Sequence, residues 1–278
     1  MAVAWFRRAG GRLVSAGLLL CLVAGASGAA WGAAGFVPHR ALYGLSLADS
    51  RSGSASFTHA VGKLEFSWSD VCDGWAVTQR THINLTGLDG REIAFGWTLS
   101  SWEAKDGLLY RFFIRRLQGE GEAEERRGQA RLSGPGGPGE AVYDMPEAQT
   151  LALPAGTVFP TQHSLDLLEA AGRGAFPLWR IVFDGAGDDG LFGINAALVQ
   201  ALPPSVAPSF DFPILQNVPS WRMDMAHFEL DNRSGEPAHE QSLRLYQNGI
   251  VDELLLDYGD FALDARLADI EALPAPDC

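Results

Sequence analysis

The residues best suited to metal or acid–base chemistry are six histidines, and their spacing matches no known catalytic or metal-binding motif. They are His39, His59, His82, His163, His227 and His239. His239-Glu240 begins like the H-E-x-x-H motif of zinc proteases, but the segment HEQSL lacks the second histidine. The six positions do not have the close spacing typical of zinc ligands. We therefore interpret each histidine as a surface or core residue, and predict no metal site.

The acidic residues also fail to define a site. In FDGAGDDGLFG, three aspartates suggest a calcium loop, but Ala186 stands at the third ligand position and Asp189 at the sixth, where the turn needs glycine. We interpret this segment as a tight acidic hairpin turn. A glycosidase needs two facing carboxylates, and 34 acidic residues offer too many chance pairs to nominate any. The sequence has no G-x-S-x-G, phosphate loop or C-x-x-C motif. We predict no catalytic residues, no cofactor and no enzyme activity.

The N-terminal segment predicts export. Three arginines lie within the first twelve residues, an apolar stretch covers about 13–26, and small residues follow. This pattern is typical of a secretory signal peptide over about residues 1–30, with cleavage between 28 and 33. A membrane anchor is the alternative, but the apolar run is shorter than the ~20 residues that span a bilayer. We expect a periplasmic protein whose residues 37–278 form one domain.

Cysteine placement supports this interpretation. Cys21 lies within the apolar stretch, and Leu20 before it is too large for a lipoprotein signal, so Cys21 should leave with the signal peptide. Cys72 and Cys278 then remain in an oxidising compartment and permit one internal disulfide. Two free thiols or an intermolecular bridge are the alternatives. Closing so long a loop would stabilise the fold by at most roughly 5 kcal/mol. The bond would tie the C-terminal strand to an early strand.

Composition and charge exclude some functions. The full chain has a formal net charge of −13 and 47% hydrophobic residues. Loss of the three N-terminal arginines makes the charge more negative, and such a surface repels nucleic acid and anionic head groups. The hydrophobic content is sufficient for a globular core. We expect no nucleic-acid partner.

Most of the chain alternates apolar and polar residues with the period of β-strands. One stripe carries Ala41, Tyr43, Leu45 and Leu47, and a second, similar stripe carries Val61, Leu64, Phe66 and Trp68. Further strands are expected within 74–87, 91–107, 107–119, 122–134, 177–202 (two strands) and 220–273 (four strands). The sequence therefore predicts about thirteen strands in an antiparallel meander.

One helix and several breaks interrupt this pattern. The segment TQHSLDLLEAAGRG predicts a helix that begins near Pro160, buries Leu165, Leu168 and Ala171, and ends at Gly172. Loops are expected over 133–140 and in the connection 202–220, which contains five prolines. Lys105-Asp106-Gly107 is interpreted as a hairpin turn, and Asn248-Gly249 as a two-residue hairpin turn.

So many antiparallel strands are expected to curl into a barrel or a partly closed spiral. Beyond about eight strands, side chains no longer fill the interior, so a cavity lined by aromatic and aliphatic residues is expected. An outer-membrane barrel is the alternative. The helix, the proline-rich connection and the two cysteines favour a soluble periplasmic protein that is not integral to a membrane.

The ordered segments VPHRALYGLSL, CDGWAVTQR, WEAKDGLLYRF, LPAGTVFPTQHSLDLLEAAGRG and VFDGAGDDG, with a near-terminal cysteine, resemble the EipB family of periplasmic cell-envelope-integrity proteins. The resemblance covers the chain from about Val37 to Cys278. It implies a broken β-barrel or β-spiral of about 13–14 strands, similar in shape to periplasmic lipoprotein carriers, with a central helix and a ligand-sized cavity. It also implies a disulfide between Cys72 and Cys278, and it supplies no catalytic residues.

These features predict a non-enzymatic periplasmic protein that supports envelope integrity by binding an apolar ligand, either a lipid or a lipidated peptide. The alternative is a scaffold that engages other envelope proteins and binds no ligand. The sequence does not identify the residues that line the cavity.

Overall fold

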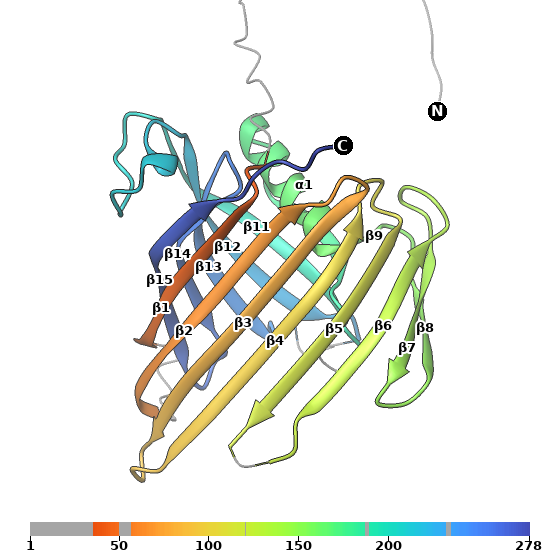
Figure 1. Ribbon diagram of the computed structural model, residues 1–278, viewed down its shortest axis with the longest axis horizontal. Coiled ribbons are helices and arrows are strands. Elements are labelled where there is room, and N and C mark those ends of the chain that lie inside the picture. The colour runs from red at the N-terminus through yellow and green to blue at the C-terminus, as the bar shows by residue number, and fades with distance from the viewer. Residues whose placement is uncertain (1–35, 50–56, 120, 187–188, 232–234) are drawn as a thin grey trace, which may run out of the picture. The chain divides into compact units, whose positions relative to one another are not determined.

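Fifteen strands and one α-helix organise the part of the chain that the computed structural model describes, residues 36–49, 57–119, 121–186, 189–231 and 235–278 (Figure 1). The predicted signal peptide lies outside these residues. The strands are β1 His39–Ala48, β2 Phe57–Asp70, β3 Gly74–Gly87, β4 Glu92–Ala104, β5 Leu109–Gln118, β6 Glu124–Leu132, β7 Gly139–Met145, β8 Gln149–Leu153, β9 Thr157–Val158, β10 Leu178–Phe183, β11 Leu191–Leu202, β12 Ser220–Glu229, β13 His239–Tyr246, β14 Val251–Asp257 and β15 Ala262–Ala272. The helix α1 spans Pro160–Arg173.

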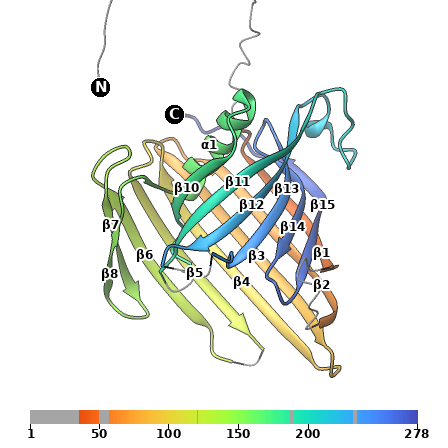
Figure 2. The same ribbon diagram turned by 180° about the vertical axis from the view of Figure 1, so that it is seen from behind.

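All fifteen strands belong to one sheet with the order β8-β7-β6-β5-β4-β3-β2-β1-β15-β14-β13-β12-β11-β10-β9. Nearly every strand pairs with its neighbour in the chain, whereas β1 pairs with β15 and so joins the first strand to the last. The sheet curls until β2–β6 face β10–β14, with α1 at one end between them (Figures 1 and 2). The expected mainly antiparallel β-spiral with one helix is confirmed.

Burial follows the predicted alternation in most strands. In β1, Ala41, Tyr43 and Leu45 are buried, as the sequence pattern indicates. In β2, Leu64 and Trp68 are buried, but Val61 is 53% exposed, so its assignment to the same stripe was wrong. The reason is the period of two, which places odd and even positions of a strand on opposite faces.

The strand count and one turn differ from the sequence prediction. The hairpin β7–β8 and the two-residue strand β9, which pairs in parallel with β10, were not predicted. The turn at Lys105-Asp106-Gly107 connects β4 to β5 as expected. The turn at Asn248-Gly249 is longer than predicted, because β13 ends at Tyr246 and β14 begins at Val251. The amide N–H of Tyr246 still donates to the Ile250 carbonyl across this four-residue loop.

The helix begins where predicted and buries Ala171 as expected, but the rest of its buried face differs from the prediction. Its buried residues are Thr161, His163, Leu167, Ala170 and Ala171, whereas Leu165 and Leu168 are only partly buried. The predicted stop at Gly172 was also wrong. Gly174 ends the helix with φ 65° and ψ 28°, and its N–H caps the last turn, a conformation that glycine adopts without a steric penalty.

The two ends of the sheet overlap through an aromatic core. Phe183 at the end of β10 packs against Phe112 of β5 and Tyr143 of β7, with ring centroids 5.8 and 6.3 Å apart. Tyr110 stacks on Phe159, just before α1, at 5.3 Å. Tyr110, Phe159 and Phe183 are fully buried. Aromatic packing therefore fixes the strand β10 inside the curve of β5–β7 and gives the sheet its spiral form.

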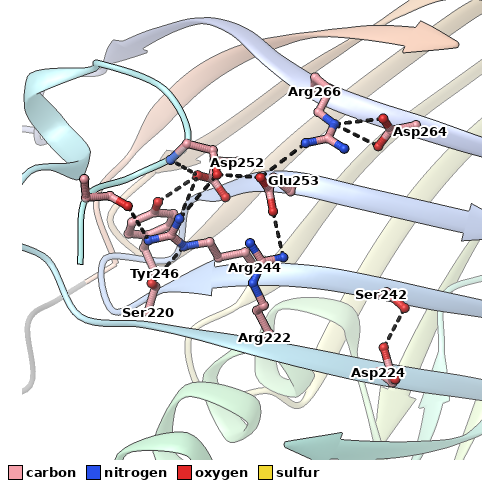
Figure 3. A network of polar contacts seen from close by, with 12 residues as sticks. Ser220, Arg222, Asp224, Ser242, Arg244, Tyr246, Asp252, Glu253, Asp264 and Arg266 are labelled. Carbon is pink, nitrogen blue, oxygen red and sulfur yellow. Dashed lines mark hydrogen bonds and ion pairs between the residues drawn. The ribbon is translucent and has the colours of Figure 1, made fainter. Parts of the chain in front are cut away.

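A buried polar network fastens the proline-rich connection to strands β12–β14 (Figure 3). The Arg244 guanidinium donates to the Ser220 hydroxyl at 3.0 Å and lies 3.8 Å from the Asp252 carboxylate. Asp252 accepts a hydrogen bond from the Tyr246 hydroxyl at 2.7 Å and one from the Ser209 amide at 3.4 Å. Both charged side chains are almost fully buried. Because a buried charge is costly without partners, these contacts hold the connection against the sheet.

A disulfide joins Cys72 to Cys278, with Cα atoms 5.9 Å apart. Cys72 lies in the turn between β2 and β3, and Cys278 lies in the tail after β15. The bond therefore connects a turn to a tail, where the sequence suggested two strands. Since β15, β1 and β2 are already neighbours, it reinforces the junction of the first and last strands and leaves the gap between β8 and β9 unlinked.

Candidate ligand-binding cavity

A cavity of about 360 Å³ lies within the spiral, bordered by α1 and by strands from both halves of the sheet. This volume is within the ~300–1,000 Å³ range of small-molecule sites. Most of its wall is aliphatic or aromatic. The apolar side chains are Phe36, Tyr43, Leu64, Phe66, Trp68, Val77, Leu99, Pro160, Leu167, Val182, Ile194, Met225, Leu243, Leu245, Val251 and Leu254. The arrangement suits a ligand with an apolar chain.

Helix α1 is held at the cavity by a carboxylate from another strand. Glu103 of β4 accepts hydrogen bonds from the amides of Thr161 and Gln162, at 2.7 and 2.8 Å. These two N–H groups belong to the first helical turn, whose backbone donors have no acceptor within the helix. The N-cap residue Phe159 provides no side-chain hydrogen bond. Burial raises the pKa of Glu103 to about 7, although both amide donors act in the opposite direction. Glu103 thus positions the helix that forms one wall.

Three of the six histidines are in the cavity wall. His39, His163 and His227 come from β1, α1 and β12, and all three are buried. The ring of His239 stacks on that of His227 with centroids 4.1 Å apart. His59 and His82 have exposed side chains and take no part in the wall. The sequence-based interpretation of the histidines as core or surface residues agrees with their burial, but it did not predict that three of them line one cavity.

The cavity wall has little charge. It contains no lysine or arginine among the described residues, and Asp184 is its one carboxylate. Burial raises the pKa of Asp184 to about 6. Burial lowers the pKa of His163 to about 4 and that of His227 to about 3. Both imidazoles are therefore neutral at pH 7, and each offers one N–H donor and one acceptor nitrogen.

The described residues bring together no set of three or more histidine, cysteine, aspartate or glutamate side chains able to hold a metal ion. His239 and Glu240 are consecutive in β13, so their side chains point to opposite faces of the sheet. Ala186 and Asp189 follow Asp184 in the turn after β10, and Asp188 lies outside the described residues. Within the same part of the chain, no helix is long and apolar enough to cross a membrane.

The sequence carried a partial signal for the cavity. Alternation in β1 and β3 indicates which faces point inward, and Tyr43 and Val77 are in the wall as that alternation implies. His163 and His227 are 64 positions apart and come from a helix and a strand. Only the curl of the sheet brings them to one cavity, so spacing along the chain does not reveal the pair.

The fold and the cavity together define a β-spiral protein with an internal apolar site, and comparison with known proteins specifies the family. The family model described as EipB-like matches residues 30–274, and the chain belongs to this family. The cell envelope integrity protein EipB of Brucella abortus (strain 2308) is 28% identical over 268 residues, which is 92% of each chain.

A solved structure shows the same fold. The crystal structure of a β-barrel-like protein of a domain of unknown function from Brucella abortus superposes with a TM-score of 0.75 and 23% identity. The match covers 86% of the present chain and 99% of the other. The family resemblance inferred from the sequence is therefore confirmed.

Proposed function

We propose that this protein acts in the periplasm and supports cell-envelope integrity by holding an apolar envelope component, a lipid or a lipidated peptide, in its cavity. The proposal is non-enzymatic: the ligand is sequestered from water and not chemically changed. The observation that carries it is the cavity of about 360 Å³ with a mostly apolar wall. The name of the Brucella relative, a cell envelope integrity protein, supports the cellular role.

The physical basis is the removal of apolar surface from water. Each Å² of apolar ligand surface that enters the cavity contributes roughly 25 cal/mol. Trp68, Phe66 and Leu243 offer such surface in the wall. The aromatic overlap holds the spiral around this space, and the disulfide reinforces the junction of its first and last strands. A site that is already formed lowers the entropic cost of binding when a ligand arrives.

The experiment compares two tryptophan substitutions of valine on neighbouring strands. Val77 of β3 is in the cavity wall, whereas Val61 of β2 is exposed on the opposite face. Mature protein purified from the periplasm is extracted with organic solvent, and bound lipids are identified by mass spectrometry. We expect wild type and Val61→Trp to carry lipid, and Val77→Trp to carry little because the new side chain fills the space.

Cells that lack the gene are complemented with the same three forms and tested for sensitivity to detergent. Failure of Val77→Trp to restore resistance, with normal protein levels, would support ligand binding as the function. If Val77→Trp restores resistance fully, or wild type is free of lipid, the binding proposal is wrong. Protein crosslinks in cells without bound lipid would then favour the alternative of an interaction scaffold.

A further inference from the structure

Two buried histidine nitrogens in the cavity wall have no hydrogen-bond partner among the residues that the structure describes. They are the Nε2 atoms of His163 and His227, and the two residues are 7% and 8% exposed. Leaving a buried polar atom unpaired is destabilising, and such atoms are uncommon in folded proteins. Both residues line the cavity, so a molecule in the cavity is the natural partner for these nitrogens.

The two residues approach the cavity from different elements. His163 is held by α1, which Glu103 anchors at its first turn. His227 is held by β12, in register with His239 of β13, and the stacked rings limit its rotation. Both residues line the same cavity, one from the helix and one from the sheet. The pair is thus a fixed polar feature in an apolar wall.

We propose that the Nε2 atoms of His163 and His227 form a polar subsite that binds one uncharged oxygen, a hydroxyl or a carbonyl, of an otherwise apolar ligand. This inference rests on the proposed function, because it specifies the chemistry of the molecule in the same cavity. A hydroxyl donates to the lone pair of one imidazole and accepts from the N–H of the other. A carbonyl accepts from both rings in their Nε2–H form.

The surrounding charges exclude an anionic head group from this position. The described wall offers no lysine or arginine to pair with a phosphate or carboxylate. The charged groups that act on His163 are Asp166 and Arg180, which pair with each other. For His227 they are the neighbouring imidazoles of His239 and His163. Moving an unpaired ion from water into such a site carries a large desolvation cost. An anionic head group of the ligand therefore stays outside, and the oxygen at the subsite is uncharged.

The test uses octane, octanol, the corresponding methyl ketone and octyl phosphate as probes at pH 8. Each probe competes with the fluorescent dye aminoanthracene for the cavity of the mature protein. Displacement of the dye is measured by the loss of energy transfer from tryptophan to the dye, since Trp68 lines the cavity. Replacing Nε2 by carbon in His163→Phe or His227→Phe removes one hydrogen bond and should weaken octanol and ketone binding about fivefold. Octane binding should be unchanged or tighter. His59→Phe, on an exposed strand position, should behave as wild type.

The outcomes separate the two proposals. If octane and octanol bind equally well to wild type, or the His→Phe variants keep their preference for octanol, the subsite is wrong while cavity binding stands. Octyl phosphate binding as tightly as octanol would overturn the requirement for an uncharged group. If no probe displaces the dye, the cavity proposal and the subsite both fail. Should both variants not fold, the ¹⁵N shifts of the wild-type imidazoles decide, because octanol must move the Nε2 resonances and octane must not.

Discussion

His163 and His227 make the stability of the protein depend on pH in a defined direction. Burial lowers their pKa values from 6.5 to about 4 and about 3. Between these values and 6.5 the unfolded chain binds more protons than the folded chain, so stability falls as pH decreases. Lowering the pH from about 7.5 to about 5 should cost about 2 kcal/mol of unfolding free energy per histidine.

Urea unfolding at these two pH values checks this expectation. His227→Phe removes one titrating group, so its loss of stability on acidification should be about 2 kcal/mol smaller than that of wild type. His59→Phe serves as the control because His59 is exposed. An equal acid dependence of wild type and His227→Phe would show that the imidazole is not held neutral. Other buried groups titrate in both proteins and cancel in the comparison.

At the scale of elements, the position of α1 depends on one long-range carboxylate. Glu103→Gln keeps the side-chain volume but leaves one oxygen to serve the amides of Thr161 and Gln162, and it removes the negative charge at the helix N-terminus. We expect a loss of roughly 1–2 kcal/mol at pH 8, where Glu103 is ionised. Glu147→Gln, at an exposed position, should lie within about 0.5 kcal/mol of wild type. Urea titration followed by circular dichroism measures both.

The contact between Glu103 and α1 shows which features of the helix could not be predicted from the sequence. The start of α1 was predictable because Pro160 suits the first helical turn. Its cap was not, because Glu103 precedes Thr161 by 58 positions and only the pairing of β4 brings them together. The buried face was also misjudged. Leu165, Leu167 and Leu168 are close in sequence, and the helix is bordered by several strands, so apolar spacing alone does not select Leu167.

The strands also divide into those that the sequence predicted and those that it did not. Long strands such as β1 and β3 were visible because their alternation extends over many residues. The two-residue strand β9 was not, since its existence depends on parallel pairing with β10. The same holds for the cavity: inward-facing positions follow from alternation, but the grouping of His163 with His227 follows from the curl of the sheet.

At the scale of the whole described fold, the disulfide reinforces the junction of the first and last strands. The bond closes a loop with a sequence separation of 206 residues, for which chain entropy gives at most roughly 5 kcal/mol. We expect Cys278→Ser to have a lower Tm than wild type and to be insensitive to reductant. Reduced wild type should approach the variant. A Tm of Cys278→Ser equal to that of oxidised wild type would contradict a stabilising role.

The overlap of the two sheet ends depends on a close approach at Gly185, just after β10. A Cβ atom there would lie 2.6 Å from the ring of Phe112, and φ is +77°. Gly259 has a matching φ of +82°, and a Cβ atom added there would meet no described atom within 4 Å. Gly259→Ala therefore isolates the backbone cost of a side chain, about 1 kcal/mol. Gly185→Ala should cost a further 1–3 kcal/mol or so, because Phe112 must shift in a packed aromatic core.

Urea unfolding of Gly185→Ala, Gly259→Ala and wild type measures this difference, and dye binding reports whether the cavity changes with it. Combining Gly185→Ala with Phe112→Leu should recover part of the lost stability, since the smaller leucine side chain relieves the contact. The effects of the two substitutions would then not be additive, which shows that the two sites are coupled. Because β10 carries Val182 in the cavity wall, displacement of the overlap should also weaken dye binding. Equal destabilisation by the two alanine substitutions, with no coupling to Phe112, would mean that this contact does not hold the spiral together.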